Sequence, residues 1–224
     1  MPKEIYYCPE LDTLEKVNKI TSQYSEIAVF PVSLQIFGKI AYREGSDGLV
    51  LIAEPKYLNL PELTLSSNPL LIVLESVEKP GNLGAVMRTA DAAGVDAVII
   101  CDPYTDLYNP NSIRSSVGCI FTRQIVAASS MEVMEWLLIN KINAYASALT
   151  DNAKGYHLFD YRVPTAFIMG TEATGLSRQW LDFCQSEIII PMMGIADSLN
   201  VSASTSILVF EALRQRNFRI QDQS

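Results

Sequence analysis

Short apolar runs alternate along most of the chain with longer segments whose apolar residues recur every three or four positions. The apolar runs predict strands at residues 70–74, 97–101, 143–148, 165–169 and 188–190, and a short strand within 117–126. The helical spacing predicts helices at residues 82–93, 130–140, 177–184 and 199–214. This alternation favours an α/β fold whose sheet is open, mostly parallel and covered on both faces.

Residues 1–60 carry a weaker version of the same pattern. It predicts a helical opening, strands at residues 27–32 and 48–53, and between them a helix capped by Ser33. Residues 59–69 hold two prolines with clustered Ser and Asn, a composition typical of a linker. We therefore predict two domains: a small N-terminal α/β segment at residues 1–66 and a larger α/β domain at residues 67–224.

Composition narrows the class of protein. Hydrophobic residues make up 49% of the 224 positions and charged residues 19%, which is typical of a folded chain. No apolar run approaches the ~20 residues of a membrane span, and the first residues lack the regions of a signal peptide. Four widely spaced cysteines and a single histidine argue against a zinc site and a disulfide framework. We therefore expect a cytoplasmic protein with reduced thiols, no metal and no membrane contact.

The net charge of −8 argues against a nucleic-acid partner unless basic residues gather locally. Three stretches contain Arg or Lys and no acid: residues 79–90, 109–123 and 212–220. Such stretches also occur on ordinary protein surfaces. Charge alone therefore leaves RNA open as a partner.

Ligands of a parallel sheet bind at the carboxyl ends of its strands, so the loops after residues 74, 101, 169 and 190 are candidates for a site. The first of these loops enters a helix through Gly81, Asn82 and Gly84, and Arg88 follows one turn later. This spacing matches neither the dinucleotide fingerprint nor the P-loop. The loop after residue 169 carries Glu172. On these residues alone, Arg88 is either a surface arginine of its helix or a functional group.

Three motifs occur in order on these loops. They are N-x-G-x-x-x-R-x-A at residues 82–90, M-G-x-E-x-x-G-L at 169–176 and I-P-M-x-G-x-x-x-S-L-N-V-S at 190–202. Together they resemble the motifs of the SpoU, or TrmH-like, RNA ribose methyltransferases of the SPOUT superfamily. Residues 109–121 also resemble the R-x-S-x-G segment of that family. The resemblance covers residues 70–216, most of the chain.

The resemblance implies a fold and a cofactor. Members of the family have an open α/β sheet whose C-terminal segment threads a deep trefoil knot, a rare exception to unknotted topology. The knot holds S-adenosylmethionine, and by position the cofactor-binding residues here would be Gly170, Ile190, Met192, Gly194 and Leu199. Members act as homodimers whose active site draws on both subunits. We therefore expect a homodimer.

The implied reaction is methyl transfer to a ribose 2′-hydroxyl in RNA. The positions of the motifs assign catalytic roles to Arg88, Asn82, Glu172, Ser198 and Asn200, and make Arg114 a candidate RNA contact. An arginine stays protonated at neutral pH, so Arg88 is expected to hold a phosphate or the nascent 2′-oxyanion. Some accounts of the family instead make this arginine the base. Asn200 could also be a residue at the start of a helix whose side chain satisfies backbone groups.

Residues 32–54 resemble the later part of the ribosomal-protein-like RNA-binding domain that many family members carry. Acids outnumber bases in this N-terminal segment, which departs from the family pattern. The appended segment favours rRNA over tRNA as substrate. Two alternatives stay open: a SPOUT-fold RNA-binding protein without activity, and a nucleotide-binding α/β enzyme unrelated to RNA.

Overall fold

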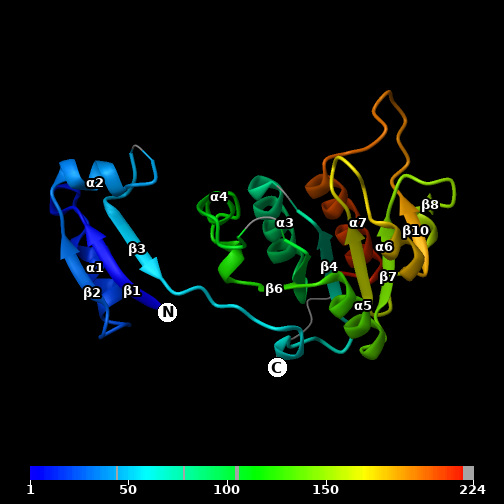
Figure 1. Ribbon diagram of the computed structural model, residues 1–224, viewed down its shortest axis with the longest axis horizontal. Coiled ribbons are helices and arrows are strands. Elements are labelled where there is room, and N and C mark those ends of the chain that lie inside the picture. Colours follow the sequence, from blue (N-terminus) through cyan, green and yellow to red (C-terminus); the bar gives the residue numbers. More distant parts are fainter. Residues whose placement is uncertain (44, 78, 104–105, 219–224) are drawn as a thin grey trace. The chain divides into compact units, whose positions relative to one another are not determined.

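A computed structural model describes residues 1–43, 45–77, 79–103 and 106–218 of the chain (Figure 1). The chain separates into two compact units, Met1–Lys56 and Tyr57–Ser224. Each unit has its own sheet.

The first unit is built on a three-stranded sheet of order β2-β1-β3. Strand β1 (Pro2–Tyr7) runs parallel to β2 (Ala28–Pro31) and antiparallel to β3 (Leu49–Ala53). Two helices complete the unit, α1 (Leu14–Thr21) and α2 (Leu34–Ile40). The predicted cap is confirmed, because the Ser33 hydroxyl accepts the Ile36 N–H at 3.4 Å. The central strand β1 was not predicted; only Ile5 within it is buried, so it carries no apolar run.

The second unit contains a seven-stranded sheet of order β6-β5-β4-β9-β7-β10-β8, in which every pair is parallel. The predicted open, mostly parallel sheet is therefore confirmed. Its strands are β4 (Leu70–Glu75), β5 (Ala97–Cys101), β6 (Gln124–Ala128), β7 (Asn143–Ser147), β8 (Lys154–Gly155), β9 (Thr165–Met169) and β10 (Ser186–Ile189). Its helices are α3 (Pro80–Ala93), α4 (Pro110–Ser115), α5 (Ser130–Ile139), α6 (Arg178–Phe183) and α7 (Val201–Gln215).

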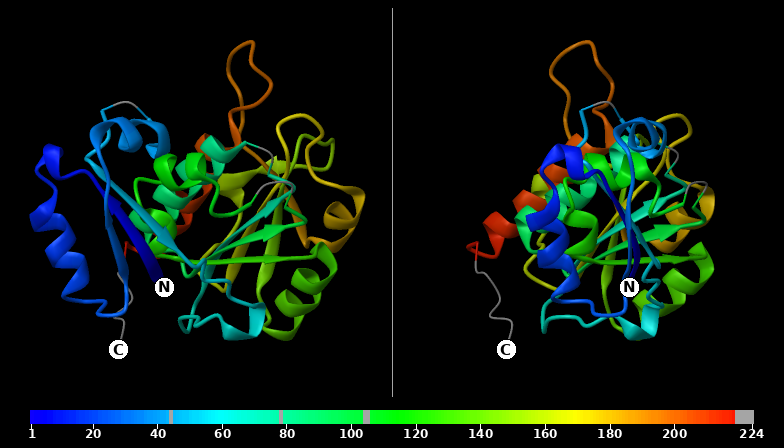
Figure 2. Two further views of the ribbon diagram at one scale, coloured as in Figure 1. Left: turned by 60° about the vertical axis from the view of Figure 1, so that its left-hand side comes forward. Right: turned by 90° about the vertical axis from the view of Figure 1, so that its left-hand side faces the viewer.

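Helices cover both faces of this sheet (Figure 2). Leu70, Ile72 and Leu74 of β4 belong to the same apolar cluster as residues of α3 and α7. Leu71 and Val73, which alternate with them, join residues of α5 and α6 on the opposite face. A strand buried on both faces must be apolar throughout, which is why apolar runs predicted the central strands.

Small side chains let α7 approach α3 closely. The hydroxyls of Thr89 on α3 and Ser206 on α7 are 2.7 Å apart. Thr205, which is fully buried, donates its hydroxyl to the Val201 carbonyl within α7. Ser206 of α7 thus lies against a neighbouring helix.

The order of strands in space departs from their order in the chain. Strand β9 lies between β4 and β7, and β10 lies between β7 and β8. Because all the strands are parallel, the carboxyl ends of β7, β9 and β10 lie side by side at one edge. The loop at 190–199 extends from this edge, away from the sheet (Figure 1, orange).

Residues 57–66, at the start of the second unit, are held along its edge strand. Leu58 pairs with Val126 of β6. The Gln124 side chain accepts the Thr64 N–H at 2.9 Å and donates to the Thr64 carbonyl at 2.7 Å. The break between the units therefore lies after Lys56, and most of the segment that resembles a linker in sequence is fixed to the larger unit.

Candidate functional site

A cavity of about 420 Å³ opens at the carboxyl ends of β7, β9 and β10. Its walls come from residues 147–150, the loop at 170–176, the loop after β10 and the first turn of α7. Pockets for small ligands commonly occupy 300–1,000 Å³, so this cavity has the size for a cofactor. Six residues predicted for the site line it: Gly170, Glu172, Ile190, Met192, Ser198 and Leu199.

Gly170 is required by the chain's own backbone. A Cβ at this position would lie 2.3 Å from the Gly175 carbonyl carbon. The two chain segments come so close because Thr171 and Gly175 exchange backbone hydrogen bonds of 3.2 and 3.1 Å, with Gly175 at a φ of +68°. The loop therefore folds tightly back on itself and forms one rim of the cavity.

The cavity also has a wall that sequence reasoning missed. Ser147, Leu149 and Thr150 follow β7 and line it. The Thr150 hydroxyl is bonded to the Glu187 carboxylate, which ties this wall to β10. The rule for parallel sheets could have predicted this wall, since β7 is also a parallel strand and its carboxyl end lies at the same edge.

Beside the cavity, three polar side chains from distant parts of the sequence form one hydrogen-bonded cluster. The Asn82 amide donates to the Glu172 carboxylate at 3.1 Å. Asn200 donates to the Asn82 amide oxygen at 3.1 Å and also to Glu172. We call these three residues the Asn82–Glu172–Asn200 cluster. It joins the start of α3, the loop after β9 and the start of α7.

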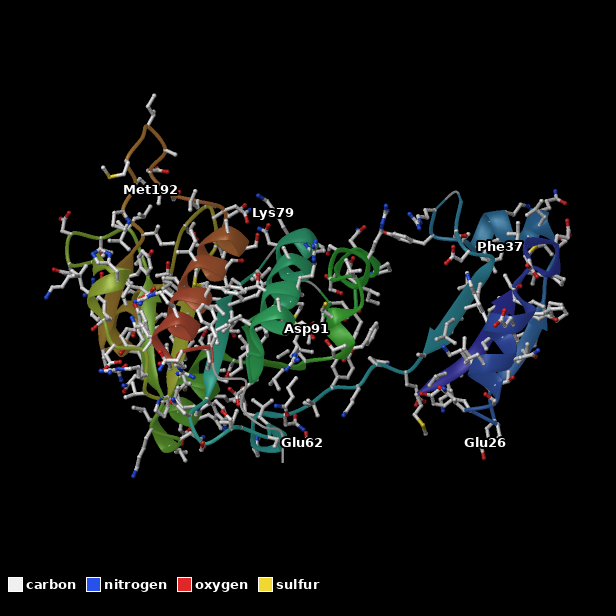
Figure 3. The ribbon with its side chains drawn as sticks, turned by 180° about the vertical axis from the view of Figure 1, so that it is seen from behind. Glu26, Phe37, Glu62, Lys79, Asp91 and Met192 are labelled. Carbon is white, nitrogen blue, oxygen red and sulfur yellow. The ribbon has the colours of Figure 1, made fainter. Side chains whose placement is uncertain are left out.

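Lys79 adds a positive charge to the cluster. Its ammonium group forms an ion pair with the Glu172 carboxylate. Figure 3 shows Lys79 at the same end of the second unit as Met192 on the loop after β10. The hydrogen bond from Lys79, followed by that from Asn82, lowers the pKa of Glu172 below its ordinary value. Glu172 is therefore a carboxylate at neutral pH and a weak proton acceptor.

Asn200 serves two purposes at once. Its side-chain oxygen accepts the Ser202 N–H at 2.9 Å and the Ser202 hydroxyl at 2.6 Å, which caps the N-terminus of α7. Its side-chain nitrogen supplies the two hydrogen bonds of the cluster. The structural and the functional interpretation of this residue are thus compatible.

The two candidate arginines lie apart from the cluster's hydrogen bonds. Arg88 is on α3, six residues beyond Asn82, which is about 9 Å along a helix that rises 1.5 Å per residue. Arg88 and Arg114 are both exposed, and neither forms a salt bridge with any residue that the structure describes. Ser115, next to Arg114, lies so close to Gly84 that a Cβ there would be 1.9 Å from its hydroxyl. Helix α4 is therefore fixed against α3.

The remaining predicted residues lie on the loop after β10. The Ser198 hydroxyl donates to the Asp197 carboxylate at 2.9 Å. Gly194 lies outside the cavity wall and has open space around it. Within the described part of the chain, no group of three His, Cys, Asp or Glu side chains could hold a metal ion. No helix there is long and apolar enough to cross a membrane.

Known proteins match both the sequence and the fold. Residues 69–210 match the SpoU rRNA Methylase family. A 23S rRNA (uridine(2479)-2'-O)-methyltransferase from Streptomyces viridochromogenes is 31% identical over 88% of this chain and 69% of its own length. A tRNA (guanosine(18)-2'-O)-methyltransferase from Escherichia coli (strain K12) is 33% identical over 72% of this chain and 70% of its own. The crystal structure of an AdoMet-bound rRNA methyltransferase from Sinorhizobium meliloti has a TM-score of 0.86 at 29% identity, covering 95% of this chain and 80% of that one.

Proposed function

Since this chain belongs to the SpoU rRNA Methylase family, we propose that it transfers a methyl group from S-adenosylmethionine to a ribose 2′-hydroxyl of RNA. The observation that carries the proposal is the cavity at the carboxyl ends of β7, β9 and β10 with the Asn82–Glu172–Asn200 cluster beside it. The motifs that resemble this family in sequence converge there from three separate segments.

The cavity suits S-adenosylmethionine in size. Its walls would hold the cofactor through Gly170, Ile190, Met192 and Leu199, and the tight loop after β9 keeps one rim in place. When bound, the cofactor supplies a methyl group activated by a positively charged sulfonium. The ionised Glu172 carboxylate lies on the cavity wall, where Lys79 already balances its charge. Gly194 is part of the same loop, and its contribution to binding stays a prediction.

The protein's own contribution is alignment and charge. The Asn82–Glu172–Asn200 cluster fixes the starts of α3 and α7 relative to the loop after β9, which limits how a ribose can enter. Ser198 lines the cavity and is assigned to shaping it. Arg88 remains protonated, so it binds an RNA phosphate or the developing 2′-oxyanion and is not the proton acceptor. Its exposure leaves its charge available to RNA.

A homodimer and a knot are part of the proposal. Arg88 lies about 9 Å along α3 from Asn82, which favours a site completed by Arg88 of a second copy. Strand topology supports the knot. β7 and β8 follow one another in the chain, yet β10 lies between them in the sheet. The chain then continues into α7, which packs on α3. A knotted exit would also explain why the loop after β10 is long.

The proposed substrate is rRNA or tRNA, with rRNA favoured. Relatives named for both kinds of RNA match this chain, so the comparisons support RNA without choosing between them. The rRNA preference rests on the first unit, since the match to the Sinorhizobium meliloti rRNA methyltransferase extends over 95% of the chain. We assign the protein to the cytoplasm, where such RNA is found.

Two measurements test the proposal. Calorimetric titration should show binding of S-adenosylmethionine and none of NAD; the reverse result would instead favour a nucleotide-binding enzyme unrelated to RNA. Incubation with labelled S-adenosylmethionine and total RNA from a strain lacking the gene should transfer label to ribose 2′-oxygens. Cofactor and RNA binding without any transfer would identify an inactive RNA-binding protein. Mapping the 2′-O-methyl sites would identify the target RNA.

A further inference from the structure

Three aromatic rings form a row on the second unit, and the middle ring, Tyr108, packs partly against the core. Tyr108 precedes α4, and Phe121 ends the short helix η3 (Cys119–Phe121) that follows it. The two rings are stacked, with centroids 6.1 Å apart and planes 13° from parallel. Tyr57 meets Tyr108 edge to face at 5.8 Å. Phe121 is 64% exposed and Tyr57 is 62% exposed, so the row ends in solvent on both sides.

The chain around this row is shaped to display side chains. Val117 has a φ of +53°, a left-handed conformation that is unusual for a β-branched residue, and is 74% exposed. Gly118 follows with a φ of +87°. Backbone hydrogen bonds from Val117 to Arg114 (3.1 Å) and from Cys119 to Ser116 (3.0 Å) close the turn that joins α4 to η3. Such strain in a non-glycine residue often marks a binding segment.

Charge is locally favourable to a polyanion on this surface. The net charge of the protein is −8, yet residues 107–123 contain no acid, and the neighbouring Asp106 carboxylate accepts the Tyr108 backbone N–H at 3.0 Å. Arg123 in this segment forms an ion pair with Asp91, with 3.1 Å between Nε of the arginine and Oδ1 of the aspartate. Arg114 is exposed and forms no salt bridge with the residues that the structure describes. The surface therefore offers flat rings and an arginine whose charge is open to a ligand, which complements a polyanion carrying bases.

The surface is rigidly joined to the candidate site. The Ser115 hydroxyl donates to the Asn111 carbonyl at 2.6 Å and lies 3.2 Å from the Pro80 carbonyl, and Gly84 leaves room for Ser115 against α3. Helix α3 also carries Asn82 and Arg88. A strand of RNA lying on the rings would thus be held at a set distance from the groups assigned to the reaction.

We propose that Tyr57, Tyr108, Phe121 and Arg114 form a binding surface for the single-stranded RNA that flanks the target nucleotide. Bases stack on the exposed rings, and Arg114 binds a backbone phosphate. The inference rests on the proposed function and adds to it how an acidic protein binds RNA. It also requires that the target lie in a loop or an unpaired segment, because bases within a duplex cannot reach a ring.

The test measures binding of a fluorescein-labelled single-stranded oligoribonucleotide by anisotropy, alongside binding of S-adenosylmethionine. Stacking on one ring is worth about five- to 150-fold in affinity, so Phe121→Ala should weaken RNA binding at least about fivefold. Phe121→Leu, which keeps apolar bulk, should be as weak as Phe121→Ala, whereas Phe121→Trp should restore binding. Leu138→Ala on α5 is the control, since Leu138 is 61% exposed in the same unit and lies outside the acid-free stretches. S-adenosylmethionine affinity should stay unchanged in every variant.

The outcomes separate this inference from the proposed function. If the wild-type protein methylates RNA and Phe121→Ala binds the oligoribonucleotide as tightly as Leu138→Ala, the surface is wrong and the function stands. If no methyl transfer occurs but Phe121→Ala loses RNA affinity, the surface stands and the function fails. If Phe121→Ala instead converts a dimer to a monomer in light scattering, the rings belong to a subunit interface and the proposal is overturned.

Discussion

The Asn82–Glu172–Asn200 cluster and the two arginines Arg88 and Arg114 belong to the same unit but differ in their contacts with the rest of the chain. Each member of the cluster is hydrogen-bonded to the other two, and Asn200 also caps α7. The arginines are exposed and form no salt bridge within the described chain. The cluster is thus arranged before any ligand arrives, whereas the arginines keep their charge for a partner. Catalysis depends on such prearranged groups, and polyanion binding depends on cations that are not already neutralised.

The largest effect is expected from Arg88→Ala. Loss of one group that stabilises transition-state charge typically lowers turnover about 100- to 1,000-fold, and a similar fall in RNA methylation is expected here. S-adenosylmethionine affinity should be unchanged, because Arg88 does not line the cavity among the residues described. The control is Arg178→Ala, an exposed arginine paired with Asp182 at 2.9 Å. Turnover at the wild-type rate in Arg88→Ala would remove the role assigned to the arginine.

At Asn200, the role in capping α7 can be separated from the role in the hydrogen-bonded cluster. Asn200→Ala removes the cap of α7, which should cost about 1 kcal/mol of stability, and it removes two hydrogen bonds of the cluster. Serine is also a good cap, so Asn200→Ser should keep most of the stability in thermal unfolding. The serine side chain is too short to bridge to Asn82, and methylation should therefore fall about three- to tenfold in both variants. Full activity in Asn200→Ser would reduce Asn200 to a structural residue.

Gly170 tests whether the cavity rim is prearranged as well. In Gly170→Ala the new methyl group would meet the Gly175 backbone, so the loop after β9 must open. Overpacking of this kind costs about 1–3 kcal/mol, and S-adenosylmethionine affinity should fall by about tenfold. Gly81→Ala is the matched control, because a methyl group added there would have nothing within 4 Å of it. Equal affinity in the two variants, measured by calorimetry, would show that the rim adapts freely.

The parts of the fold that sequence could predict are those in which burial itself sets the pattern. Strands β4, β5 and β9 are buried throughout, so their apolar runs mark them unambiguously. Strand β1 buries only Ile5, and the two residues of β8 are a strand only because β10 pairs with them. Neither leaves a local signal, because the stabilising contacts come from residues far away in the chain.

The candidate site divides in the same way. The positions of Asn82, Glu172 and Asn200 could be predicted from motifs that resemble a known family, and the cavity edge from the rule for parallel sheets. Their mutual hydrogen bonds join residues up to 118 positions apart, which no spacing reveals. The wall that follows β7, at residues 147–150, carries no motif. Gly170 was expected to make room for a ligand, and the contact it makes room for is the chain's own loop.

The smallest effect is expected from removing the positive charge that Lys79 adds to the Asn82–Glu172–Asn200 cluster. The pKa of Glu172 is lowered from 4.5, chiefly by the hydrogen bond from Lys79, so its contribution to stability is present above pH 4.5 and is lost as the pH falls through its folded-state pKa. The group is largely exposed, so the effect on the unfolding temperature should be slight. Lys79→Met should raise the pKa of Glu172 toward 4.5, as measured by carbon NMR of the carboxyl group. Lys16→Met, which breaks an exposed ion pair with Asp47, is the control. An unchanged titration of Glu172 in Lys79→Met would mean that the two asparagines of the cluster hold the carboxylate by themselves, and that the cluster needs no cation to be prearranged.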